Sequence, residues 1–309
     1  MLKRIAVAFL VVLLGLAVLP FLLPRPGLDG QIPQQPFADS RFVQVSGVRL
    51  HLRERQGNDQ RPLVVLLHGF AGSGWSWRHT LSALEQSGYA VVSVDLPPFG
   101  YSERSSGGGH WVDLVEGLLD QEWPQREIAL VGHSMGATVA ADLAARLPER
   151  SQSLVFVAGS PHARVAAGPS WLMRMPPLAR AAEVYAAHSL ITEQRLGEML
   201  ASAYGREPDS EELQGYMHPL TIPATTPALL RRLTQRGPSP EGWRRTPTTL
   251  IWGENDDWIP LQLGERLLEL YPELTLEVIA EAGHNPMETH AEAFEALLLE
   301  ALERTVTPL

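Results

Sequence analysis

Short apolar runs alternate with amphipathic segments along most of the chain. Residues 63–67 and 89–94 are apolar runs of a length typical of strands that are buried on both faces. Residues 42–45 and 48–52 instead alternate apolar with polar side chains around a Ser-Gly pair, which predicts an antiparallel hairpin. Further strands are predicted at 128–131, 154–157, 249–252 and 274–279, and helices at 75–86, 111–123, 135–147, 261–270 and 292–303.

This order of elements predicts an α/β fold with a mostly parallel sheet and helices on both of its faces. The alternation stops after the strand at 154–157 and resumes at residue 249. Residues 161–246 are rich in Pro, Met, Arg and helix-forming residues and show no clear strand, so they predict an inserted helical cap. We expect the core of the fold to comprise residues 41–160 and 247–309.

The N-terminus has a different pattern, because residues 5–23 contain no charge and no strongly polar side chain. As a helix this run would be about 28 Å long, which nearly matches a hydrocarbon core of about 30 Å. Two basic residues precede it, so residues 1–24 predict a single-pass signal anchor with the folded part on the non-cytoplasmic side, the periplasm in a bacterium. Secretion after cleavage of the leader is the alternative, although residues 24–28 offer no small-x-small cleavage site. Residues 25–40 hold several prolines and glycines and predict a linker.

Composition excludes several classes of function. The net charge is -10 and no basic stripe is visible, so nucleic acid is not an expected partner. The chain has no cysteine, which excludes disulfides, thiolate zinc sites and a cysteine nucleophile. Lys3 is the only lysine, so the folded part has no Walker A or Schiff-base lysine. The ten histidines show no metal-binding pattern, and we expect neither a metal nor a cofactor.

Residues 132–136 read Gly-His-Ser-Met-Gly, which fits the pattern G-x-S-x-G. The pattern alone is weak, but here an apolar strand precedes it and an alanine-rich helix follows it. A sharp turn from strand to helix would force Ser134 into strained backbone geometry and raise its hydroxyl above the edge of the sheet. The positions two before and two after the serine would crowd each other, which explains why both are glycine. We therefore interpret Ser134 as a candidate nucleophile.

A serine hydroxyl needs a base, and the base needs an orienting carboxylate, to attack at neutral pH. Acidic residues follow directly after the predicted strand at 249–252, and His284 lies in a turn after the last predicted strand. Strand ends in an open α/β sheet are where side chains converge on a site. The charge that develops on the substrate oxygen also needs hydrogen-bond donors. We expect these donors to be the backbone amides of Met135 and of Phe70, which lies in the glycine-rich loop after residues 63–67.

Together these residues resemble the α/β-hydrolase superfamily, in particular its esterase- and lipase-like serine hydrolases with an HG-x-x-G-S loop. The resemblance runs from about residue 42 to the end, excluding most of the cap. The matching motifs are His68-Gly69 and Gly72-Ser73 for the oxyanion loop, 132–136 for the nucleophile elbow, 253–260 for the acid loop and Gly283-His284 for the histidine loop. The resemblance implies Ser134 as nucleophile, His284 as base and then acid, and Asp256 rather than Asp257 as its orienting carboxylate. For Asp95, which begins another family-like loop, we expect a structural role.

The resemblance implies hydrolysis of a small-molecule carboxylic ester through an acyl-enzyme. The predicted anchor and an apolar stretch of the cap at 171–178 favour lipophilic esters such as monoacylglycerols. Peptidases, C–C hydrolases, haloperoxidases and acyltransferases share the same triad and stay open as alternatives. A non-catalytic binding protein is a further alternative, which an intact triad disfavours. The elbow serine argues against epoxide hydrolases and haloalkane dehalogenases, which need an aspartate there.

Overall fold

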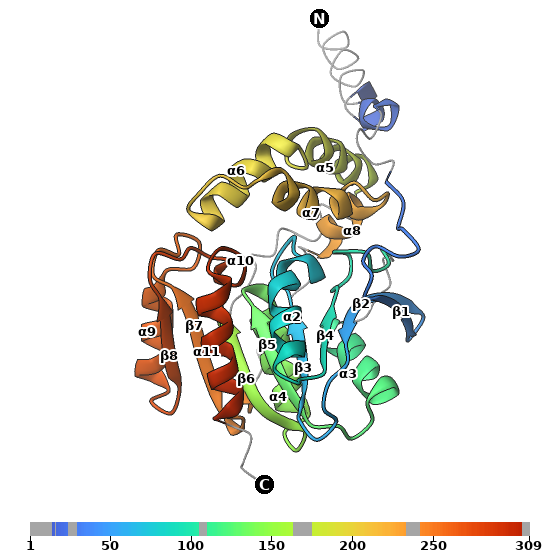
Figure 1. Cartoon of the computed structure of the whole chain (residues 1–309). Helices are drawn as coiled ribbons and strands as arrows, with labels where there is room; N and C mark the ends of the chain where they lie inside the picture. Colours follow the sequence, from blue (N-terminus) through green and yellow to red (C-terminus); the bar gives the residue numbers. More distant parts are fainter. Residues whose placement is uncertain are drawn as a thin grey trace, which may run out of the picture.

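An eight-stranded sheet forms the centre of the computed structural model, which describes residues 14, 15, 17–23, 30–104, 110–162, 175–232 and 242–304. The strand order is β1-β2-β4-β3-β5-β6-β7-β8 (Figure 1). β2 pairs antiparallel with both β1 and β4, and the remaining pairs are parallel. The strands are β1 Ser40–Val45, β2 Val48–Arg55, β3 Leu63–Leu67, β4 Val91–Val94, β5 Ile128–His133, β6 Ser151–Val157, β7 Thr248–Gly253 and β8 Thr275–Ile279.

Helices cover both faces of this sheet, as predicted. Leu63, Val65 and Leu67 of β3 pack with α3, α4 and α9, whereas Val64 and Leu66 pack with α2 and α11, because successive side chains of a strand point to opposite faces. All five are almost completely buried, which explains the continuous apolar run. The helices are α2 Arg78–Gln86, α3 Trp111–Glu122, α4 Met135–Arg146, α9 Leu261–Leu270, α10 Pro286–Thr289 and α11 Ala291–Glu303, with the 3-10 helix η1 at Gly74–Trp77.

The chain between β6 and β7 forms a helical cap over one edge of the sheet (Figure 1). Its described helices are α5 Pro176–Ser189, α6 Glu193–Tyr204, α7 Ser210–Leu220 and α8 Thr225–Arg232, and the 3-10 helix η3 at Trp243–Arg245 follows. Asp209 and Glu212 form a capping box at the start of α7, which satisfies amides that the first turn leaves unpaired. Of the predicted apolar stretch of the cap at 171–178, residues 171–174 lie outside the described residues.

Several local boundaries differ from the predictions. The predicted helix at 75–86 begins as the 3-10 turn η1, and β4 starts at Val91 rather than residue 89. The short helix α10 was not predicted, because its four residues are too few to show a helical period. Its first residue, Pro286, suits the first turn of a helix, where the missing N–H is not needed.

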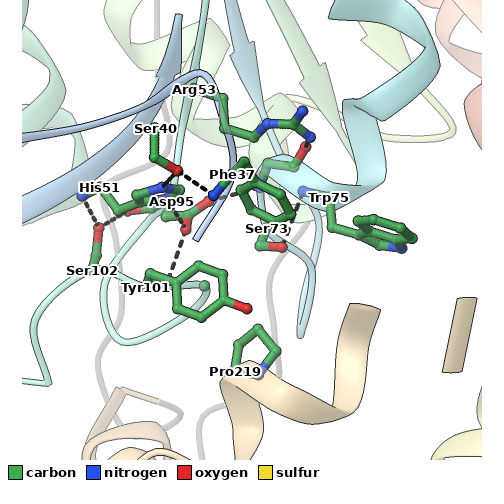
Figure 2. Close-up of polar contacts among 12 residues, drawn as sticks. Phe37, Ser40, His51, Arg53, Ser73, Trp75, Asp95, Tyr101, Ser102 and Pro219 are labelled. Atoms are coloured by element: carbon green, nitrogen blue, oxygen red, sulfur yellow. Dashed lines mark hydrogen bonds and ion pairs between the residues drawn. The ribbon is translucent and has the colours of Figure 1, made fainter. Parts of the chain in front are cut away.

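The predicted anchor and linker are described only in part. Among the described residues, no helix has the length and apolar character needed to cross a membrane. Residues 1–13, 16 and 24–29 lie outside the description, so the anchor remains a prediction without structural support. Within the predicted linker, Phe37 is half-buried against the folded part: its ring is stacked on Trp75 and lies edge-on to Tyr101, and the guanidinium of Arg53 is 4.3 Å above it (Figure 2).

Candidate active site

Ser134 lies on a sharp turn between β5 and α4. Its backbone has φ 49° and ψ -113°, a conformation that L-residues rarely adopt. A Cβ on Gly132 would lie 2.4 Å from the carbonyl oxygen of Gly136, and one on Gly136 would lie 2.2 Å from that of Leu67. The two glycines are therefore required by close backbone contacts, and the predicted crowding around the turn is present.

Asp256 and His284 come from two loops and meet in the structure. The Nδ1 atom of His284 lies 2.8 Å from Oδ2 of Asp256, and the other carboxylate oxygen accepts the amides of Trp258 and Ile259, both at 2.9 Å. A carboxylate only accepts, so Nδ1 carries the hydrogen and Nε2 is left as an acceptor, the state needed in a general base. Asp256 is buried whereas the neighbouring Asp257 is exposed, so the structure distinguishes the two acids.

Ser134 and His284 line the same pocket. In the described part of the chain, the hydroxyl of Ser134 forms no hydrogen bond, either with His284 or with another group. Bonds between a nucleophile and its base are often long without substrate and tighten in the complex. The pocket is lined on the core side by Gly69, Phe70, Gly72, Ser76, His133, Ser134, Trp258, His284 and Asn285, and on the cap side by Met199, Leu200, Ala203 and Tyr216.

Three contacts that the sequence did not reveal hold His284. Its amide donates to the carbonyl oxygen of Ala203 in cap helix α6 at 2.7 Å, and the ring of Trp258 is stacked on its imidazole. His133 donates from Nε2 to the carbonyl oxygen of His284 at 3.0 Å. Burial, and then the charge that His284 can carry, hold the pKa of His133 well below its usual range, so His133 stays neutral. His133 occupies a variable position of the pattern G-x-S-x-G, so only the structure reveals its hydrogen bond to His284.

The two amides predicted as oxyanion donors belong to Phe70, in the same pocket as Ser134, and to Met135, the next residue of the chain. Phe70 lines the pocket with Ser134, and Met135 is the first residue of α4, where helical N–H groups have no intrahelical partner. In the described part of the chain, neither amide donates a hydrogen bond to another protein group. Both are therefore available to a substrate oxygen, and the dipole of α4 favours negative charge at that end.

Asp95 is the centre of a buried network that connects β2 with the segments after β3 and β4 (Figure 2). Its carboxylate accepts the amide of Gly74 at 2.6 Å, the amide of Tyr101 at 2.7 Å and Nδ1 of His51 at 2.7 Å. Burial alone would raise the pKa of Asp95, but His51 beside it reverses the effect and lowers that pKa. Asp95 is not among the described residues that line the pocket, which agrees with the structural role expected for it.

No group of three or more histidine or acidic side chains that could hold a metal ion occurs among the residues that the structure describes.

The family model described as alpha/beta hydrolase fold matches residues 62–291 of this chain. The chain therefore belongs to the α/β hydrolase fold family, and it is a hydrolase. The mostly parallel sheet with an inserted cap agrees with this membership, and the fold predicted from the sequence is confirmed.

Relatives with curated names include hydrolases of unsaturated dioates. The chain is 29% identical over 295 residues to the 2-hydroxy-6-oxononadienedioate/2-hydroxy-6-oxononatrienedioate hydrolase of Burkholderia vietnamiensis, which covers 86% of this chain and 96% of that protein. It is also 29% identical over 259 residues to an uncharacterized hydrolase of Bacillus subtilis, covering 79% and 90%.

Solved structures share the fold at lower identity. A membrane phospholipase A described as a bacterial virulence factor has a TM-score of 0.69 at 21% identity, covering 99% of this chain and 100% of that one. A meta-cleavage product hydrolase from Pseudomonas fluorescens has a TM-score of 0.66 at 20% identity, covering 85% and 97%. At these identities the likeness concerns the fold alone.

Proposed function

We propose that this hydrolase cleaves neutral carboxylic esters through an acyl-enzyme. The observation that carries the proposal is the 2.8 Å hydrogen bond from His284 to Asp256 in a loop that lines the same pocket as Ser134. His284 takes the proton of the Ser134 hydroxyl as the oxygen attacks the ester carbonyl. The amides of Phe70 and Met135 bind the oxyanion. His284 then gives the proton to the leaving alcohol, and activates the water that releases the acid.

Lipophilic esters, monoacylglycerols included, are the favoured substrates. The cap contributes Met199, Leu200 and Ala203 to the pocket, and the core contributes Phe70. These apolar side chains suit an acyl chain, since burying each CH₂ group is worth about 0.8 kcal/mol. If the acyl chain binds here, kcat/KM for p-nitrophenyl esters should rise with chain length from acetyl to decanoyl.

C–C bond hydrolysis is the second candidate, and the names of the relatives favour it. Their dioate substrates carry two carboxylates. Among the described residues that line the pocket there is no Arg or Lys to bind such groups, which is why we place the ester first. The two reactions are separated by offering the enzyme p-nitrophenyl esters and a 2-hydroxy-6-oxononadienedioate side by side.

The test compares the full chain in detergent with its Ser134→Ala variant. Removing a triad serine should lower kcat about a million-fold. Turnover of esters but not of the dioate supports the main proposal, and the reverse supports the second candidate. If neither substrate reacts, labelling by a fluorophosphonate that depends on Ser134 would indicate an enzyme with a different substrate. Absence of labelling would favour a non-catalytic binding protein.

The proposal includes the N-terminal anchor predicted from residues 5–23. One structural neighbour is named a membrane phospholipase A and is covered along its whole length. Arg180 on α5 donates to the carbonyl oxygens of Pro20 and Leu23, so the described end of this segment contacts the cap. An anchored chain should stay with membranes through an alkaline carbonate wash, and release by that wash would contradict the anchor.

A further inference from the structure

A buried polar cluster forms one wall of the pocket. Ser76, Tyr216 and Asn285 line the pocket beside Ser134, and each of the three is at most 5% exposed. Their side chains are joined by hydrogen bonds: the hydroxyl of Tyr216 lies 2.9 Å from Ser76 Oγ and 3.1 Å from Asn285 Nδ2. Behind them lies the buried carboxylate of Glu288, so the wall is built around a negative charge.

Glu288 receives four hydrogen-bond donors. Its Oε2 atom accepts from Nη1 of Arg78 at 2.5 Å and from the hydroxyl of Tyr204 at 2.9 Å. Its Oε1 atom accepts from the hydroxyl of Tyr216 at 2.5 Å and from Nδ2 of Asn285 at 2.8 Å. An ionised carboxylate can only accept, so every one of these groups must turn a hydrogen toward Glu288.

This requirement fixes the direction of the remaining hydrogen bonds. Tyr216 has one hydrogen and gives it to Glu288, so the bond between Tyr216 and Ser76 uses the hydrogen of Ser76. Burial, and then the charge of Glu288, raise the pKa of Tyr216 far above its usual range, which keeps that hydrogen in place. Asn285 donates both hydrogens of Nδ2, one to Glu288 and one to Tyr216.

The polar atoms of this wall that can still form a hydrogen bond are acceptors. Within the described chain, Oδ1 of Asn285 has no hydrogen-bond partner, and Ser76 Oγ keeps lone pairs but has no spare hydrogen. The cation closest to the cluster, Arg78, is bonded to Glu288 and lies 3.7 Å from Glu212, so its charge is compensated. A carboxylate placed here would meet acceptors without a donor, whereas a hydroxyl would find the partner it lacks.

We propose that Ser76 and Asn285 form a subsite that recognises a hydroxyl group on the alcohol part of the ester, so that neutral monoesters of polyols are the preferred substrates. We assign the alcohol part to this side because Asn285 lines the pocket together with His284, which would protonate the leaving oxygen. This inference rests on the ester hydrolysis proposed above. A site that pairs a substrate hydroxyl discriminates strongly against analogues without it, since its own polar groups would be left unpaired.

The test measures kcat/KM of the full chain in detergent for three esters. These are glycerol monobutyrate, its di-O-methyl ether, and the anionic 2-carboxyethyl butyrate, whose carboxylate is on the alcohol part, with p-nitrophenyl butyrate as the measure of ester hydrolysis itself. We expect the first to exceed the second about tenfold or more, and the third to be the poorest. If p-nitrophenyl butyrate turns over but the methyl ether or the carboxyethyl ester is used as well as the diol, the subsite is refuted while ester hydrolysis stands. If no ester turns over, both proposals fall.

Variants assign the preference to the cluster. Glu288→Gln replaces an acceptor-only group with one that also donates, so the hydrogen directions are no longer fixed, and the diol-to-ether ratio should fall below about threefold. Ser76→Ala removes one pocket acceptor with a smaller risk to folding and should also lower the ratio. Glu198→Gln is the matched control, because Glu198 lies on α6 and pairs with Arg195 at the surface. An unchanged ratio in both Glu288→Gln and Ser76→Ala would overturn the assignment.

Discussion

Replacing Gly283 by alanine should displace the histidine loop from the cap. A Cβ on Gly283 would lie 2.4 Å from the carbonyl oxygen of Ala203, the same oxygen that accepts the amide of His284 at 2.7 Å. Ordinary contact begins at 3.4 Å, so the loop and α6 must separate by about 1 Å. Neither side can yield through a flexible side chain, because the atom that the methyl group meets belongs to the backbone.

The magnitude follows from this displacement. A misplacement of about 1 Å at a catalytic group costs about a hundredfold in rate, so kcat for p-nitrophenyl butyrate should fall by that factor. Forcing an extra methyl group into a packed seam should also lower the free energy of unfolding by about 1–3 kcal/mol. The assay measures initial rates at saturating substrate, with urea unfolding in parallel to establish that the variant is folded.

Gly197→Ala is the matched control on the same cap helix. A Cβ on Gly197 would have no neighbour within 4 Å, and alanine is favoured over glycine inside a helix by about 0.5–1 kcal/mol. This variant should keep the wild-type kcat and gain slight stability. If folded Gly283→Ala keeps kcat within twofold of the wild type, the contact between the cap and the histidine loop does not position His284, and the reasoning is refuted.

Two further predictions concern buried titratable residues around the site. Burial lowers the pKa of both His68 and His133 in the folded protein. Below the unfolded value of about 6.5, the unfolded chain therefore binds protons that the folded chain does not. The free energy of unfolding should decrease as the pH is lowered, by up to about 1.4 kcal/mol per pH unit for each histidine. Urea unfolding between pH 7.5 and 5.5 measures this, His133→Gln should weaken the dependence, and a flat profile would contradict it. Asp95→Asn removes a charged acceptor from Gly74, Tyr101 and His51, and should lower the free energy of unfolding by about 3 kcal/mol. Because Asp95 does not line the pocket, kcat of the folded variant should stay within tenfold, and a larger loss would give Asp95 a catalytic role.

Much of the fold could be predicted because its signals are local. The apolar runs at β3 and β5 reflect burial on both faces, and the switch from strand to helix around Ser134 is encoded by two glycines that backbone contacts require. The order of serine, acid and histidine along the chain also pointed to one edge of the sheet. The sequence did not predict where η1 and β4 begin, or that α10 exists, because a few residues carry too little periodicity.

The surroundings of the candidate site were decided only by the tertiary structure. The sequence by itself determined the α/β class, the candidate nucleophile and the absence of cysteine and of lysine beyond position 3. It did not reveal that Ala203 of the cap holds the amide of His284, or that Glu288 orders Tyr216 and Asn285 along the pocket wall. Periodicity and turn chemistry act over a few neighbouring residues, whereas these contacts join segments that are far apart in the sequence and adjacent only in the folded protein.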